Sequence, residues 1–266
     1  MNPIRIGAVV RRHWLVLWRG PHRWFEISFW PLMDAILWGS LGIYMSKTGT
    51  TTSAGAATTV NLLLAGIVLF WTLTVVQMTM SMSIMDETNT RNLLNVLTTS
   101  VTPAEYLTGV AIFGLLKLSL TMTTLTLVTL GIYGFSLGAL GWVTLPIVAI
   151  LIVCGWSIGF LVLGLMLRFG PSAEILTWGL NYVMMSISGV FFPASVLPAG
   201  LGKVAQVLPT GKAFGAMRQV LSGGPVPWGQ LGEAAIGSVV LLGLALVFCA
   251  WMLRVFRRRG FVTRYS

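Results

Sequence analysis

Residues 60–84 read VNLLLAGIVLFWTLTVVQMTMSMSI and contain no charged side chain. A helix needs about 20 consecutive, predominantly apolar residues to cross the hydrocarbon core of a bilayer, and this stretch is long enough to do so. The whole chain is 56% hydrophobic and only 9% charged, whereas a soluble domain carries about 25% charged residues. These observations exclude a water-soluble globule and predict an integral membrane protein built from helices.

Working outward from this stretch, similar apolar runs recur before and after it. We expect one all-α domain over residues 1–266, with six transmembrane helices joined by short polar segments. Pro31 interrupts the first run, and several prolines separate the last two. The expected spans cover residues 24–45, 60–84, 104–133, 142–167, 173–192 and 231–253.

The distribution of Lys and Arg predicts the orientation. Because the number of spans is even, both chain ends share one side, which carries twelve basic residues against four on the other. The excess of basic residues marks the cytoplasmic side, so both termini are expected there. The twelve are Arg5, Arg11, Arg12, Arg19, Arg23, Arg91, Arg168, Arg254, Arg257, Arg258, Arg259 and Arg264; the four are Lys47, Lys203, Lys212 and Arg218.

Both chain ends are basic and lie beside apolar spans. Residues 1–23 alternate basic and apolar positions at helical spacing, which is typical of an amphipathic helix in the membrane interface. Residues 254–266 form a basic tail. The net charge of +10 is therefore interpreted as a membrane-surface signal, with lipid as the partner and no nucleic acid.

The polar segment after residues 60–84 is the most informative. Asp86 and Glu87 favour a helix N-terminus, and an apolar stripe follows, so we expect a short cytoplasmic helix over residues 86–100. Such a helix either docks in a groove of a soluble partner or rests on the bilayer surface. The residues that would contact a partner are Asp86, Glu87, Arg91, Leu93, Leu94, Val96 and Leu97.

A few side chains are candidates for a translocation path. Asp34 lies deepest among the carboxylates in the predicted spans and is either functional or a structural partner of a neighbouring helix; Lys117 also lies within a span. Met78 and Met82 share a helical face and predict either an adaptable apolar lining or plain packing, without a metal role. Gly155 and Gly159 form a pair that permits close helix packing, within the chain or against a second copy.

Two sequence patterns argue against catalysis by this chain. Gly155–Gly159 fits G-x-S-x-G, but this pattern requires a strand–turn–helix setting that an apolar helix lacks. There is no G-x-x-x-x-G-K-[ST] phosphate loop, so ATP and Mg²⁺, if they are used, are expected in a partner subunit. We therefore expect no catalytic residue, no metal site and no cofactor in this chain.

Several short motifs occur in a characteristic order: FWPLMD at 29–34 with LWG at 37–39, TRNLLNVL at 90–97, SGVFFP at 188–193 with VLP at 196–198, and LPT at 208–210. In this order the chain resembles the ABC type-2 permease family, the membrane subunits of exporters for drugs, glycolipids and polysaccharides. Members often have Ser-Pro where this chain has Ser100-Val101, a departure that blurs the end of the short cytoplasmic helix.

The resemblance implies a function that the residues alone do not. Residues 86–100 would be the coupling helix that a cytoplasmic ATP-binding subunit receives, and residues 191–229 would form short re-entrant helices on the outer side. Two copies would pair in the plasma membrane (bacterial inner membrane) and export an amphiphilic drug, lipid or lipid-linked glycan. The alternatives are a stand-alone secondary transporter or channel that uses Asp34 for ion coupling, and a membrane enzyme or scaffold.

Overall fold

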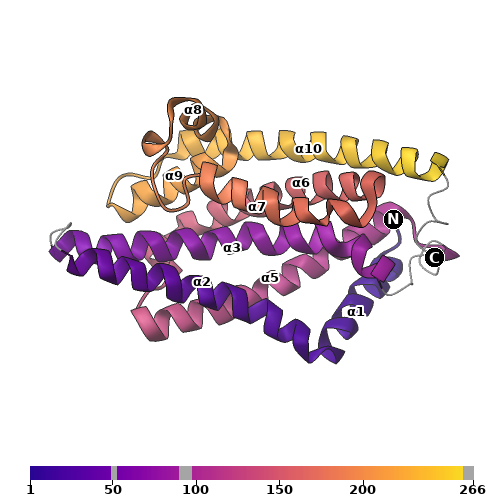
Figure 1. The fold of residues 1–266 in the computed structure, drawn as a ribbon, viewed down its shortest axis with the longest axis horizontal. Coiled ribbons are helices and arrows are strands. Elements are labelled where there is room, and N and C mark those ends of the chain that lie inside the picture. The colour runs from indigo at the N-terminus through magenta and orange to yellow at the C-terminus, as the bar shows by residue number, and fades with distance from the viewer. Residues whose placement is uncertain (49–52, 90–97, 260–266) are drawn as a thin grey trace.

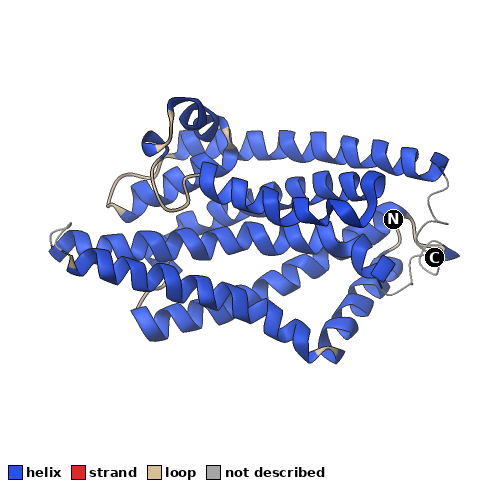
Figure 2. Cartoon of the chain, in the orientation of Figure 1, coloured by secondary structure: helices blue, strands red, loops and turns tan. Residues whose placement is uncertain are grey.

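The computed structural model describes residues 1–48, 53–89 and 98–259, and within these ranges the secondary structure is helical, with no strand (Figure 2). This confirms the all-α prediction. The long helices are α1 (Pro3–Arg19), α2 (Pro21–Lys47), α3 (Ser53–Asn89), α5 (Pro103–Tyr133), α6 (Thr144–Phe169) and α10 (Trp228–Arg259). The shorter ones are η1 (Leu137–Val143), η2 (Gly170–Glu174), α7 (Ile175–Ile187), η3 (Ala194–Val196), α8 (Ala199–Val207) and α9 (Pro209–Leu221).

In the described part of the chain, four segments are long and apolar enough to cross a membrane: Thr59–Glu87, Pro103–Tyr133, Leu137–Phe169 and Trp228–Phe256. The expected first and fifth spans fall short of this criterion for different reasons. Pro31 and Asp34 lower the hydropathy of α2, although the helix has 27 residues. Helix α7 has only 13 residues and is therefore about 20 Å long, less than the roughly 30 Å of a bilayer core.

Helix α3 forms the centre of the bundle and packs against α2, α5, α6 and α7. Its side chains Leu64, Ile67, Leu69 and Leu73 are fully buried. Figure 1 shows α3 running along the long axis of the molecule between α2 and α6. The uncharged apolar stretch over residues 60–84 thus lies in the helix around which the other elements are arranged.

The paired glycines of α6 serve packing within the chain. A Cβ atom at Gly155 would lie 2.6 Å from the Leu73 carbonyl oxygen, and one at Gly159 would lie 2.7 Å from Met80 Cβ. Both neighbours belong to α3, so the absence of a side chain lets α6 and α3 approach closely. Of the two interpretations of this motif, the structure supports packing between helices of one chain.

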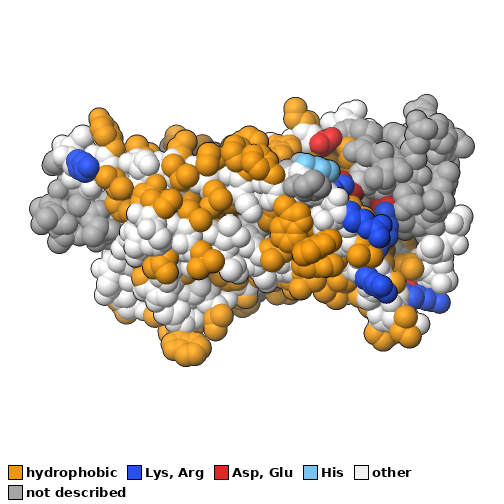
Figure 3. All heavy atoms as spheres, turned by 90° about the horizontal axis from the view of Figure 1, so that it is seen from below, with side chains coloured by type: hydrophobic (Ala, Val, Ile, Leu, Met, Phe, Trp, Pro, Cys, Tyr) orange, Lys and Arg blue, Asp and Glu red, His pale blue; other side chains and the backbone are white. Residues whose placement is uncertain are grey.

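The long helices run between the two ends of the molecule, and shorter elements lie at these ends (Figure 1). Helix α1 and the C-terminal end of α10 lie at one end, and α8 and α9 lie at the other (Figure 1). Figure 3 shows Lys and Arg side chains gathered toward the end that carries α1, while hydrophobic side chains cover much of the middle of that face. This arrangement agrees with the predicted separation of basic residues.

The prolines between α7 and α10 belong to a compact cap at the end opposite α1. Gly189 adopts a positive φ of 64° just after α7, and the chain then turns into η3, α8 and α9. The Phe191 ring stacks on Trp38 of α2 with centroids 3.5 Å apart, and the Ser188 hydroxyl lies 2.7 Å from that of Thr210. The residues of the SGVFFP motif therefore close this end of the bundle against α2 and α9.

Candidate functional site

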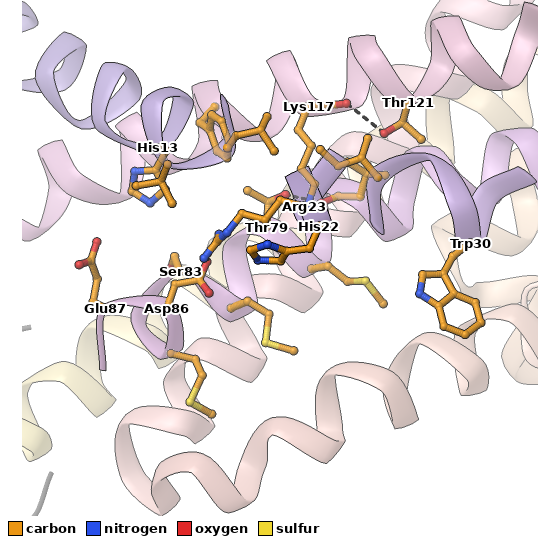
Figure 4. Close-up of a pocket in the computed structure, with 18 of the residues that line it drawn as sticks. His13, His22, Arg23, Trp30, Thr79, Ser83, Asp86, Glu87, Lys117 and Thr121 are labelled. Atoms are coloured by element: carbon orange, nitrogen blue, oxygen red, sulfur yellow. Dashed lines mark hydrogen bonds and ion pairs between the residues drawn. The ribbon is translucent and has the colours of Figure 1, made fainter. Parts of the chain in front are cut away.

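A cavity of about 410 Å³ opens among α1, α2, α3, α5 and the start of α7 (Figure 4). Its lining mixes charged side chains with sulfur-containing and aromatic ones, a combination that suits an amphiphilic ligand better than a simple ion. The charged and titratable lining residues are Arg12, His13, His22, Arg23, Asp86, Glu87, Lys117 and Glu174. The methionines and tryptophans are Met78, Met82, Met85, Trp30, Trp71 and Trp178.

Glu87 lies at one end of the cavity and is paired with Arg12 of α1. The two guanidinium nitrogens of Arg12 donate to the two carboxylate oxygens, with Nη2 2.5 Å from Oε2. The Glu87 side chain is only 2% exposed, and that of Arg12 is 36% exposed. The hydroxyl of Tyr106 lies 3.2 Å from Glu87 Oε1 and 3.1 Å from the Ser83 carbonyl oxygen, where it can donate to one of them at a time. This paired carboxylate ties the end of α3 to α1 and α5.

A second and a third ion pair extend this connection. Arg23 Nη1 lies 3.5 Å from Asp86 Oδ2, and Arg5 Nη1 lies 3.6 Å from Glu105 Oε2. We call the three pairs Arg5–Glu105, Arg12–Glu87 and Arg23–Asp86 the basic clamp. Asp86 and Glu87 precede residues 90–97 in the chain and Glu105 follows them, so the clamp holds both flanks of the predicted coupling helix.

The flank after residues 90–97 is also organised by local sequence. Thr102, Pro103 and Glu105 begin α5 with a reciprocal capping box: Glu105 donates its backbone N–H to the Thr102 hydroxyl and accepts the Thr102 N–H at 2.9 Å. The other carboxylate oxygen of Glu105 accepts the backbone N–H of Asn2 at 2.7 Å, and Arg5 donates to the Ser100 carbonyl oxygen at 2.7 Å. The start of α1 is thereby fastened to the start of α5.

Helix α1 also has an apolar attachment to α5. Val9 and Leu17 are buried, and a Cβ atom at Gly109 would lie 2.7 Å from Val9 Cβ. The sequence predicts an amphipathic helix in this region, and the structure adds that its apolar face packs on the bundle. Gly20 then breaks the helix, and Pro21 starts α2 in a new direction (Figure 1).

The structure separates the predicted contact residues of the coupling helix. Arg91, Leu93, Leu94, Val96 and Leu97 lie outside the described residues. Asp86 has a half-exposed side chain, whereas Glu87 faces inward and is held by Arg12. The carboxylate of Glu87 is buried within the chain, and a contact between Glu87 and a partner stays a prediction.

Three of the four predicted path residues line the same cavity. Met78 and Met82 are joined there by Met85 from the same face of α3, and Lys117 enters from α5 (Figure 4). Met80, which alternates with them in the sequence, is 1% exposed and packs in a separate apolar cluster with Phe160 and Leu163. The helical periodicity thus separates lining methionines from packing ones.

Asp34, the fourth predicted path residue, is not part of the cavity lining. Its Oδ2 accepts a hydrogen bond from Trp71 Nε1 at 3.0 Å, and the Trp71 ring is one wall of the cavity. Asp34 therefore orients a lining residue on a neighbouring helix. The partner is an indole, whereas the structural alternative considered from the sequence was a basic or hydroxyl group.

The sequence pattern gives His13 no role beyond that of a residue in a basic segment. In the structure, His13 lies in the cavity wall (Figure 4). Its Nδ1 lies 3.0 Å from the Val9 carbonyl oxygen, and its ring lies 5.3 Å from that of Phe113 and 6.0 Å from that of Tyr106. Burial lowers the pKa of His13 from its ordinary value of 6.5, because desolvation disfavours the charged imidazolium. The helical spacing of His13 from Val9, Val16 and Leu17 is the only sequence signal for this position.

The chain matches a known family of membrane proteins. A model of the ABC-2 type transporter family matches residues 5–222, which include the basic clamp and every residue that lines the cavity. A search of curated proteins found no match.

Proposed function

Because the chain belongs to the ABC-2 type transporter family, we propose that it is the permease subunit of an ATP-driven exporter and that a separate polypeptide binds and hydrolyses ATP. The observation that carries the proposal is the family match over most of the chain, together with the clamp that it includes. A membrane subunit of such a transporter works with an ABC ATP-binding partner. The sequence of this chain contains no G-x-x-x-x-G-K-[ST] phosphate loop, so ATP binding is assigned to the partner.

The ATP-binding subunit docks on the segment over residues 86–100. The basic clamp supports this assignment, because a pull on either flank of the segment reaches α1 through Arg12 or Arg5. Arg12, Asp86 and Glu87 also line the cavity, so the coupling segment and the cavity share side chains. A displacement of the docked segment would therefore change the shape of the cavity directly, without a relay through distant helices.

Six segments cross the membrane in this proposal. Helices α2 and α7 join the four long apolar segments, and the cap that begins at residue 188 adjoins the end of α7. The end that carries α1 is cytoplasmic, since basic side chains concentrate there. The cap formed by η3, α8 and α9 then lies on the outer side as a re-entrant structure. The membrane is the bacterial inner membrane.

The cargo is amphiphilic, and two copies of the chain form the path between them. The cavity favours such a cargo because charged groups lie beside tryptophan rings and thioethers, which adapt to apolar ligands of different shape. ATP binding would draw the coupling segments of both copies together and open the path outward, and hydrolysis would reset it. The alternative of a stand-alone transporter needs Asp34 for ion coupling. The hydrogen bond from Trp71 to the Asp34 carboxylate gives that alternative no support.

Affinity purification of the tagged chain in mild detergent, followed by an ATPase assay on the eluate, tests the proposal. A soluble ATPase should co-purify in stoichiometric amount, and Leu93→Asp with Leu97→Asp should abolish its recovery. The matched control is Val207→Asp, which places the same charge on an exposed residue of α8 at the opposite end. Elution of the wild-type chain alone, without ATPase activity, would support a stand-alone transporter instead.

A further inference from the structure

The carboxylates of the cavity differ in how they are engaged. Glu87 is held by Arg12 and Tyr106, and Asp86 lies near Arg23. Glu174, which immediately precedes α7, is exposed on the cavity lining and has no ion-pair partner within the described part of the chain. Glu174 is therefore a carboxylate of the cavity lining that is in no ion pair with the other described residues.

Aromatic and sulfur-containing side chains line the same cavity as this carboxylate. Trp178 lies one helical turn after Glu174 and also lines the cavity, with 41% of its surface exposed. Met82 packs against the apolar cluster that contains Ala173, the residue before Glu174 in the chain. Trp30 of α2 lines the cavity as well and is 54% exposed. A cavity that is lined by a carboxylate, indole rings and a thioether suits a hydrophobic cation.

We propose that Glu174, Trp178, Trp30 and Met82 form the binding site for the transported cargo and that this cargo is a hydrophobic organic cation, such as a quaternary ammonium or phosphonium compound. The inference rests on the proposed function, because it assumes that the cavity belongs to the transport path. Glu174 neutralises the positive centre, the indole faces add cation–π attraction, and Met82 packs on the apolar body.

An anionic amphiphile fits the same cavity less well. Arg12 and Arg23 line it, but their guanidinium groups already face Glu87 and Asp86. An anion would have to separate one of these pairs, whereas a cation meets Glu174 without displacing anything in the described residues. Lys117 on α5 is the residue through which an anion would act, and the test therefore includes it.

A structural role is the competing explanation for these residues. Tryptophan is frequent at the membrane–water interface, and a carboxylate at the start of a helix interacts favourably with the helix dipole. These roles make no distinction between ligands of opposite charge. Two probes of nearly the same shape, tetraphenylphosphonium and tetraphenylborate, do make that distinction.

The experiment measures binding of both probes to the full-length chain purified in mild detergent, by quenching of tryptophan fluorescence. The wild type should bind tetraphenylphosphonium more tightly than tetraphenylborate. Glu174→Gln should weaken phosphonium binding about fivefold, and Trp178→Leu about threefold. The control is Glu233→Gln, since Glu233 pairs with Lys212 at the opposite end and should leave binding unchanged.

Three outcomes would overturn the proposal. Glu174→Gln could bind tetraphenylphosphonium as tightly as the wild type does, or the wild type could fail to bind it. The third outcome is that the wild type binds tetraphenylborate more tightly than tetraphenylphosphonium and that Lys117→Met abolishes this borate binding. Each variant is first checked for an unchanged elution profile and melting temperature, so that a folding defect is recognised. Recovery of the ATPase subunit from the same preparations reports on the proposed function separately. If the subunit co-purifies but the phosphonium does not bind, the permease assignment stands and the cation assignment falls.

Discussion

Arg12 and Glu87 are 75 residues apart in the sequence, yet Arg12 donates from Nη1 to Glu87 Oε1 and from Nη2 to Glu87 Oε2. The pair joins α1 to the last turns of α3, immediately before the segment that we assign to the ATPase contact. Because the Glu87 side chain is buried, this ion pair is better shielded from solvent than an ordinary ion pair at the surface. The pair therefore stabilises the coupling region and also makes α1 part of it.

Glu87→Gln should lower stability, because it leaves the Arg12 charge opposite a neutral amide. The expected loss is about 1–2 kcal/mol, at the lower end for a buried pair since Arg12 is partly exposed. Thermal unfolding of the detergent-purified protein, followed by tryptophan fluorescence, measures it. Glu233→Gln is the control, as Glu233 belongs to an exposed pair at the other end. Equal melting temperatures for Glu87→Gln and the wild type would show that the pair contributes nothing.

Gly155→Ala should disturb the contact between α6 and α3. The new Cβ atom would lie 2.6 Å from the Leu73 carbonyl oxygen, a backbone atom that cannot move aside without shifting α3. Overpacking of this kind costs about 1–3 kcal/mol. Gly179→Ala on α7 is the matched control, because nothing lies within 4 Å of its Cβ position. A melting temperature that falls in both variants alike would argue against tight α3–α6 packing as the cause.

His13 should make stability depend on pH. Burial lowers its pKa in the folded protein below the ordinary value of 6.5, so the unfolded chain binds a proton more readily. The stabilisation is therefore present above pH 6.5 and decreases as the pH falls below it. Arg12, Arg23 and Asp86 influence the same site.

His13→Gln should reduce the difference in melting temperature between pH 7.5 and pH 5. His22→Gln, which changes the other histidine of the cavity lining, serves as the control and should leave that difference as in the wild type. The prediction fails if both variants keep the full pH dependence of the wild type.

Asp34→Asn should be nearly silent. The amide oxygen of Asn can still accept the Trp71 N–H, so the indole keeps its orientation in the cavity wall. Asp34→Leu removes the acceptor and should cost about 1–2 kcal/mol, because a buried donor is left unpaired. ATP-driven transport of a probe cation in vesicles should persist in Asp34→Asn. Loss of transport in this variant, together with sensitivity of wild-type transport to proton uncouplers, would support the alternative that the chain is a secondary transporter.

Much of the fold is predictable because apolar length is a local property. Residues 60–84 and 142–167 are so long and apolar that a spanning helix is the expected result, and the structure has α3 and α6 there. The fifth span is different. Hydropathy over residues 173–192 is continuous, but Gly189 turns the chain at a positive φ, and α7 ends at Ile187. Hydropathy measures transfer free energy and carries no information about this turn.

The candidate site is less predictable, because it depends on contacts between distant segments. Helical periodicity puts Met78 and Met82 on one face, but only the packing of α3 against the other helices makes that face line the cavity. Nothing in the sequence pairs Arg12 with Glu87 or Trp71 with Asp34, since such pairs require the relative position of separate helices. One local sequence signal does identify a boundary next to the site. Residues Thr102-Pro103-Ala104-Glu105 have the pattern of a capping box, which marks the start of α5.

Site-specific crosslinking from position 86 shows whether an ATPase subunit docks at the predicted coupling segment. Asp86→Cys introduces a thiol at a half-exposed side chain, while the native Cys154 and Cys249 are buried, so a maleimide crosslinker should react mainly at the new position. We predict a crosslinked product that contains this chain and a soluble ATPase, and a change in its yield when ATP is added. Failure of position 86 to crosslink to any ATPase, while a cysteine at Lys203 on the opposite end does so, would contradict the account.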